Sequence, residues 1–258
     1  MKYIFKTLII ALLFISPLNS AENKSKLLEP KWTVDGFFGQ FDKASLQRGY
    51  QVYKEVCASC HSMSYLSYRN LGEKGGPEFT KQEVKAIASQ YEIQDGPNQE
   101  GEMFMRPARP SDKFVSPYPN TNAARVANGG AYPPDMSVLV KARKGGADYV
   151  YSVLMGYTED VPEGISLEEG VYYNKYMIGN KIRMPKPIND GSVEYTDGTQ
   201  ATEEQISKDV VAFLTWAAEP HLEERKKTGF KAVVYLLILT ILGFVMKRKI
   251  LLRIEPKV

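Results

Sequence analysis

The two cysteines of this chain limit most strongly what it can fold into. Among 258 residues the only cysteines are Cys57 and Cys60, and His61 follows the second one directly. The chain can therefore hold at most one disulfide, and a four-ligand Cys/His zinc site would need both cysteines and both histidines, His61 and His221. The sequence also lacks a glycine-rich phosphate loop, an H-E-x-x-H motif and a G-x-S-x-G motif. These absences argue against the common nucleotide-binding, metalloprotease and hydrolase sites.

The segment Cys57-Ala58-Ser59-Cys60-His61 has the spacing that attaches c-type haem. Its two thiols lie on the same side of a helical turn, where they can add to the two haem vinyl groups, and the adjacent imidazole then reaches the iron. A thioredoxin-like dithiol and a simple disulfide are the alternatives. The dithiol normally occurs in a βαβ unit, whereas the pattern over Phe41–Val56 predicts an amphipathic helix, capped by Asp42, that runs into the motif. We therefore predict one covalently attached haem c.

An electron-transfer haem iron needs a second axial ligand, and the candidates are His221 and the methionines. His221 lies among three glutamates, which is typical of a surface position. Met184 lies in the polar loop Ile182–Pro187, which two prolines stiffen, and its Arg and Pro neighbours make it a poor core residue. The residues alone make Met184 the leading candidate and leave the choice open.

The two ends of the chain indicate export and membrane anchoring. Residues 1–21 combine two lysines, an apolar stretch and small residues at a cleavage point, which is typical of a secretory signal peptide. An uncleaved anchor is the alternative; a mitochondrial presequence fits less well, because the first arginine is Arg48. The stretch Ala232–Met246 has no charged residue and is flanked by lysines and arginines. We expect a transmembrane helix over 232–250 after a linker at 225–231, with a buried core helix as the alternative.

The export signal and the charge pattern together predict the topology. We expect residues 22–224 to lie in the periplasm and 251–258 in the cytoplasm, across a bacterial inner membrane. The net charge of +3 is too balanced for a nucleic-acid-binding protein. Residues 7–246 carry a net charge of −3, and Gly145–Asn174 contain six acidic residues and no basic one. This acidic stretch is either a solvated loop or a surface that attracts a basic soluble partner.

Further patterns predict the secondary structure of the body. A short helix is expected over Lys81–Tyr91, and seven of the fifteen prolines fall within 97–134, which predicts irregular structure there. Asp190-Gly191 and Asp197-Gly198 are turn signals that could close a short hairpin. A capping box beginning at Thr202 opens a terminal helix with an apolar stripe.

The helix before the haem motif and the helix after the methionine loop indicate the fold class. Together they predict a mainly α, class I cytochrome c-like haem domain, with one C-terminal transmembrane helix. Met184 lies 123 positions after His61, which is more than a minimal domain of this class needs. The chain should therefore contain large loop insertions.

Several segments beyond the haem motif carry a family resemblance over nearly the whole mature chain. They are Cys57–Met63, Tyr68-Arg69-Asn70-Leu71, Arg106-Pro107, Ser111-Asp112, Ala123-Ala124-Arg125, Pro133-Pro134-Asp135-Met136-Ser137, Met184-Pro185 and Trp216-Ala217-Ala218-Glu219-Pro220. In combination they resemble the cytochrome c1 family, the haem subunits of the ubiquinol–cytochrome c oxidoreductase (cytochrome bc1) complex. The Pro-Pro-Asp and Trp-Ala-Ala-Glu-Pro segments are specific in combination, whereas the haem motif alone would not select a family.

The resemblance implies a role for each matched residue and for the chain. It implies electron relay from a Rieske iron–sulfur subunit to cytochrome c, beside cytochrome b, in a complex that we expect to be dimeric and whose quinol site lies on other subunits. A free-standing membrane-anchored c-type cytochrome and a haem sensor with an open sixth position are the alternatives. The implied roles are thioether attachment at Cys57 and Cys60, iron ligation by His61 and Met184, propionate pairing by Arg125, and lining of the haem crevice by Pro133 and Pro134.

Overall fold

A computed structural model of the chain describes residues 25–254. The predicted signal peptide and residues 255–258 of the predicted tail lie outside this range. The described part is mainly helical, as predicted, and its strands form two small antiparallel pairs. The α-helices are α2 (Lys43–Val52), α3 (Lys81–Ala88), α4 (Thr121–Ala127), α5 (Gly146–Met155), α6 (Glu203–Ala218) and α7 (Leu222–Ile254). The strands are β1 (Glu92–Asp95), β2 (Phe104–Pro107), β3 (Tyr172–Tyr173) and β4 (Lys181–Ile182), and short helical turns η1 (Tyr53–Cys57), η2 (Tyr68–Gly72) and η3 (Ile178–Asn180) complete the body.

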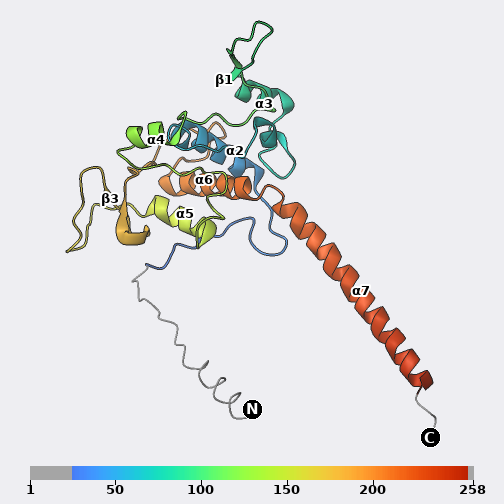
Figure 1. Cartoon of the computed structure of the whole chain (residues 1–258). Coiled ribbons are helices and arrows are strands. Elements are labelled where there is room, and N and C mark those ends of the chain that lie inside the picture. Colours follow the sequence, from blue (N-terminus) through green and yellow to red (C-terminus); the bar gives the residue numbers. More distant parts are fainter. Residues whose placement is uncertain (1–24, 255–258) are drawn as a thin grey trace, which may run out of the picture.

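The core forms where α6 packs between α2 and α5 (Figure 1). Gly49 makes the α2–α6 crossing close, because a Cβ at this position would lie 2.1 Å from the backbone oxygen of Asp209. The Tyr50 ring stacks edge-on against the Phe213 ring, with their centroids 5.7 Å apart. The predicted apolar stripe of the terminal helix is thus the face that α2 covers. The packing of α2 against α6 therefore sets the position of the C-terminal end of α2, which leads into the haem motif.

A buried carboxylate joins the same two helices. The side chain of Asp209 is fully buried and accepts hydrogen bonds from Arg48 Nε at 2.8 Å, Ser45 Oγ at 2.6 Å and Gln205 Nε2 at 3.0 Å. A buried charge is tolerated only when its hydrogen-bonding capacity is filled. Thr202 caps α6 as predicted, with its hydroxyl accepting from Gln205 N. The Gln205 side chain serves Asp209 instead of completing the predicted capping box.

Several predicted boundaries differ from the structure. Asp42 caps the first helix as expected, but the α-helical part begins at Lys43 and gives way to a π turn at Tyr53. The helix expected over 81–91 ends at Ala88. The segment 97–134 is largely irregular, as predicted; its regular parts are β2, which pairs with β1, and α4, which Asn120 caps. Prolines restrict the residues around them, and of these two elements α4 lies in a gap between prolines, whereas β2 ends at Pro107.

The hairpin expected near the two Asp-Gly pairs was a wrong prediction. Residues 183–202 contain no strand, and Gly191 N donates instead to Ala201 O at 2.8 Å, which closes a wide loop. The Asp197 carboxylate accepts from Thr199 N at 2.9 Å and pairs with Arg48. Side-chain pairing to α2 thus takes the place of a strand ladder. The hairpin nearest the methionine loop is β3–β4.

Helix α7 extends away from the other helices as one long, continuous helix (Figure 1). Its most apolar window has a mean hydropathy of 2.2 and is not buried against the rest of the described chain. Its 33 residues are enough to cross a hydrocarbon core of about 30 Å at 1.5 Å per residue. The predicted apolar helix is confirmed, while the segment 225–231, expected to be a linker, is helical and continuous with it.

Candidate haem site

The haem motif lies where α2 changes its winding. Ala58 N donates to Tyr53 O at 2.8 Å, which is the wider spacing of a π turn. Cys60 N and His61 N then both donate to Cys57 O, at 3.1 and 2.9 Å. This tight turn holds the two thiols and the imidazole within one compact segment at the helix end. Such π turns are frequent at functional sites, and the hydrophobic pattern of the sequence did not reveal this one.

The environment of the two cysteines distinguishes attachment from redox-dithiol chemistry. Both are thiols in the structure; Cys57 is buried and Cys60 is half-buried. Burial raises the pKa of the Cys57 thiol to about 12. A reactive dithiol instead has a cysteine whose pKa lies well below the usual value of about 8.5. Cys57 is therefore not the low-pKa cysteine that a redox dithiol would need.

His61 is oriented by the loop that contains the two adjacent prolines. The imidazole is buried, and its Nδ1–H donates to the backbone oxygen of Pro134 at 2.8 Å. Burial lowers the pKa of His61, although the hydrogen bond to Pro134 acts in the opposite direction. A neutral imidazole whose Nδ1 is occupied offers its Nε2 lone pair to a metal. The structure thus brings His61 and Pro134 together, and half-buried Pro133 adjoins them in the chain.

Asp135 stabilises this arrangement, and sequence reasoning gave it no separate role. Its carboxylate accepts from Ser62 Oγ at 2.8 Å, from Ser64 N and Oγ at 2.9 and 2.7 Å, and from Ser137 N at 2.8 Å. Burial alone would raise the pKa of Asp135, but the hydrogen bonds from Ser137 and Ser64 lower it to about 2. The bond to Ser137 N is an Asx turn, the one sequence-level signal that could have identified this residue.

Arg125 lies on α4 and is exposed. One of its Nη atoms donates to Gly130 O at 3.1 Å, and its guanidinium lies 5.7 Å from the centre of the Tyr132 ring. Within residues 25–254, Arg125 forms no ion pair with a carboxylate. Its charge is therefore available to an anionic group beside the Pro133–Pro134 loop.

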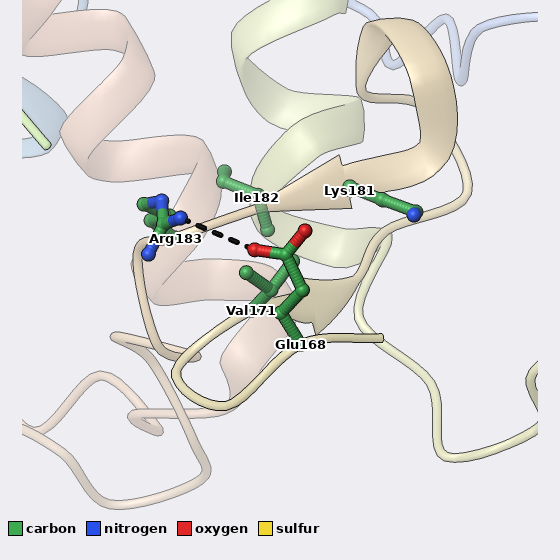
Figure 2. Close-up of a pocket in the computed structure, with 5 residues that line it drawn as sticks. All are labelled: Glu168, Val171, Lys181, Ile182 and Arg183. Atoms are coloured by element: carbon green, nitrogen blue, oxygen red, sulfur yellow. Dashed lines mark hydrogen bonds and ion pairs between the residues drawn. The ribbon is translucent and has the colours of Figure 1, made fainter. Parts of the chain in front are cut away.

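Met184 directly follows the short β3–β4 pair and is half-buried. The Tyr157 hydroxyl donates to the Met184 backbone oxygen at 3.0 Å. The preceding residue, Arg183, follows the last residue of β4. Figure 2 shows its side chain facing that of Glu168, and their charged atoms lie 3.5 Å apart. A second Nη atom of Arg183 lies 3.5 Å from Gly129 O. This side chain therefore links the methionine loop to the turn that follows α4.

His221 occupies a different environment from these residues. Its side chain is 75% exposed, and Nδ1 lies 3.6 Å from a Glu224 carboxylate oxygen at the start of α7. This agrees with the surface interpretation of the sequence. Of the two ligand candidates, only the methionine is half-buried in a loop that is hydrogen-bonded to the body.

The donor set fits haem c. Among residues 25–254 it combines two thiols within one turn, a buried neutral imidazole with one free ring nitrogen, a soft thioether in a braced loop and an arginine without a carboxylate partner. Covalent attachment, iron ligation and propionate pairing in haem c proteins draw on groups of these kinds.

Comparison with known proteins decides the family. The family model described as "Cytochrome C1 family" matches residues 32–254. The chain belongs to the cytochrome c1 family. Members of this family carry one covalently bound haem c and transfer electrons, and the predicted haem motif, mainly helical fold and C-terminal apolar helix agree with membership.

Curated relatives of this cytochrome c1 sequence occur in bacteria, plants and fungi. A protein named "Cytochrome b/c1" from Bradyrhizobium diazoefficiens is 50% identical over 92% of this chain, which spans 38% of that protein's length. "Cytochrome c1-2, heme protein, mitochondrial" from Solanum tuberosum is 53% identical over 86% of the chain and 84% of its own length. The Saccharomyces cerevisiae "Cytochrome c1, heme protein, mitochondrial" is 46% identical over 84% of the chain and 69% of its own length.

Proposed function

We propose that this chain is the electron-relaying haem subunit of a respiratory quinol–cytochrome c reductase. In this proposal it accepts one electron from a Rieske iron–sulfur subunit and passes it to cytochrome c. The observation that carries the proposal is the buried His61, whose Nδ1 is fixed by Pro134 O at 2.8 Å, immediately after the two thiols. When bound, haem c supplies reversible one-electron chemistry whose potential depends on the axial ligands, burial and polar neighbours.

Each residue of the site has a separate task in this proposal. Cys57 and Cys60 would hold the porphyrin by thioether bonds, and His61 and Met184 would supply ligands to the iron. A thioether ligand raises the reduction potential relative to a second histidine. Arg125 pairs with a propionate, which its lack of a carboxylate partner within residues 25–254 supports. The half-buried Pro133 and Pro134 form a wall of the crevice and exclude water from the imidazole.

The acidic stretch Gly145–Asn174, which includes α5 and the loop that follows it, supports a basic electron acceptor. Of its six acids, Asp148 is engaged within the fold, since Trp32 Nε1 donates to it at 2.7 Å. The other five acids lie on exposed loop positions, from Glu159 to Glu169. An exposed negative loop accelerates encounter with a positively charged protein through long-range attraction. We therefore assign this loop to the approach of cytochrome c.

We propose the topology that the sequence predicts. Residues 1–21 would be the export signal, 22–224 the periplasmic haem domain, 225–231 the juxtamembrane segment, 232–250 the transmembrane span and 251–258 the cytoplasmic tail, in a bacterial inner membrane. The exposed apolar surface of α7 supports anchoring by this helix. The helical state of 225–231 makes the connection to the body stiffer than an extended linker would be.

The partners in this proposal are cytochrome b and the Rieske subunit in a dimeric complex, with the quinol site on those subunits. The bacterial relative named "Cytochrome b/c1" supports the first partner, and the Candida albicans relative named "Cytochrome b-c1 complex catalytic subunit, mitochondrial", 48% identical, supports the complex. This chain would thus be one subunit of an oxidoreductase, while the quinol site lies on the other subunits.

Purification in mild detergent tests the assignment. We expect a b-type haem spectrum and an iron–sulfur signal to travel with this chain, together with quinol–cytochrome c reductase activity. Isolation of the c-type haem alone would favour a free-standing cytochrome. Carbon monoxide gives a second readout, because a His/Met-ligated iron should leave the reduced spectrum unchanged, whereas rapid binding would show an open sixth position.

A further inference from the structure

The segment Trp32–Phe41, which we term the N-terminal loop, folds onto the beginning of α7. The Lys226 ammonium donates to three loop carbonyl groups, those of Val34, Gly36 at 2.6 Å and Gly39 at 3.5 Å. The backbone N–H of Phe41 donates to Glu223 Oε1 at 2.9 Å. Two consecutive turns of α7 thus hold both ends of the loop, and Figure 1 shows this segment curving beside the top of the helix.

The glycines of the loop force two aromatic side chains outward. Gly36 has a φ of +73°, and a Cβ on Gly39 would lie 2.1 Å from Asp35 O. Both positions therefore favour glycine, and the chain between them makes a tight reversal. Phe37 and Phe38 occupy this reversal, and both side chains are exposed.

Phe230 of α7 completes a cluster of three rings. The ring centroids of Phe37 and Phe38 lie 5.7 and 6.1 Å from that of Phe230, in edge-on orientations. Phe37 is 53% exposed, Phe38 80% and Phe230 45%. Stacked phenylalanines that stay exposed on one side are a surface that a folded protein normally covers.

The position of the cluster along α7 identifies what covers it. Phe230 is followed by Lys231 and then by the uncharged stretch 232–246. The cluster therefore lies at the boundary between the basic juxtamembrane turns and the apolar span. Aromatic side chains concentrate at this depth of a bilayer, where an apolar ring meets the headgroup region.

We propose that Phe37, Phe38 and Phe230 form a lipid-docking patch that inserts at the headgroup–acyl boundary of the leaflet facing the body. The Lys226 charge is directed into the loop carbonyls, so the contribution of the patch itself is apolar. The body is then seated on the membrane at a second point beside the helix. This seating limits rocking of the haem domain about the start of α7.

Depth-dependent fluorescence quenching tests the patch in the full-length, haem-containing chain reconstituted in phosphatidylcholine vesicles. The reporter is Phe38→Trp, with the wild type measured in parallel so that the emission of the two native tryptophans is subtracted. Leu236→Trp, on the apolar part of α7, is the lipid-exposed reference. Val126→Trp, at an 85% exposed position on α4, is the aqueous reference.

We expect phosphatidylcholine brominated near the headgroup end of its acyl chains to quench the added Phe38→Trp emission, and acrylamide to leave it unchanged. Val126→Trp should show the reverse. Strong acrylamide quenching of Phe38→Trp would overturn the proposal, and so would quenching by neither agent, which indicates a protein partner over the patch. Adding Lys226→Ala to Phe38→Trp should release the loop and reduce bromine quenching, while an unchanged haem spectrum shows that the body remains folded.

Discussion

The two sides of the proposed haem site are built in different ways. The histidine side, residues 57–61 with 134–137, continues a core helix and is closed by the Asp135 network. The methionine side, residues 182–187, begins in a strand pair of two residues each and is held by the Tyr157 hydroxyl at the Met184 backbone and by the Lys186–Glu203 ion pair at 2.7 Å. The Arg183–Glu168 pair beside it is exposed and long, so it contributes little.

This difference implies that the two ligands affect different properties of the protein. Changes on the histidine side should alter haem attachment and the stability of the fold together, because the same residues belong to the core. Changes on the methionine side should alter the potential of the iron with little effect on folding. The mobile and tunable ligand would then be the thioether.

Cys57→Ser should have the largest effect, because it removes one of the two covalent links and introduces a hydroxyl at a buried position. We expect the pyridine haemochrome spectrum to shift to that of a single thioether and the haem-loaded yield to fall sharply. Ser59→Ala, an exposed position between the two cysteines, is the matched control. A wild-type haemochrome spectrum from Cys57→Ser would contradict the assignment.

Met184→Leu should lower the midpoint potential by a few tenths of a volt, since axial ligands set haem potentials over a range of about 0.8 V. The two side chains have similar volumes, so the free energy of unfolding should change by less than about 1.5 kcal/mol. Redox titration and denaturant unfolding measure the two quantities. Met177→Leu, in the neighbouring turn, should leave the potential unchanged; an unchanged potential in Met184→Leu would remove that residue from the site.

The sequence could predict the parts of the fold and site that depend on local signals, but not those that depend on contacts between distant residues. The helix into Cys57 and the helix from Thr202 carry strong periodicity and caps, so their existence was predictable, although the π turn at Tyr53 was not. The hairpin prediction failed because the Asp197 side chain bonds to Thr199 and Arg48, a choice made by tertiary contacts. Met184 could be favoured from its prolines, but the Tyr157 contact joins residues 27 positions apart and has no local signature.

Asp135→Ala tests the histidine side at its polar network. Three serines would lose a charged acceptor, and a hydrogen bond to a charged group contributes about 1.5–3 kcal/mol. We expect destabilisation of that order by denaturant unfolding at neutral pH, with Asp160→Ala in the exposed acidic loop as the control. The pKa of Asp135 is lowered on folding to about 2, so its contribution is present above the unfolded value of about 3.9 and is lost as pH falls toward 2. Equal stability of variant and wild type at neutral pH would show that the network is dispensable.

Tyr157→Phe tests the methionine side with the smallest change. It removes only the hydroxyl that donates to Met184 O at 3.0 Å, so the expected loss of stability is about 1 kcal/mol, the usual net value of a neutral hydrogen bond. The loop should nevertheless hold the sulfur less firmly, and the charge-transfer band that reports methionine–iron bonding should weaken. Tyr172→Phe, an exposed β3 residue, should change neither quantity. If Tyr157→Phe instead destabilised the domain as much as Asp135→Ala, the methionine loop would belong to the same cooperative core as the histidine side, and the thioether would not be the independently tunable ligand.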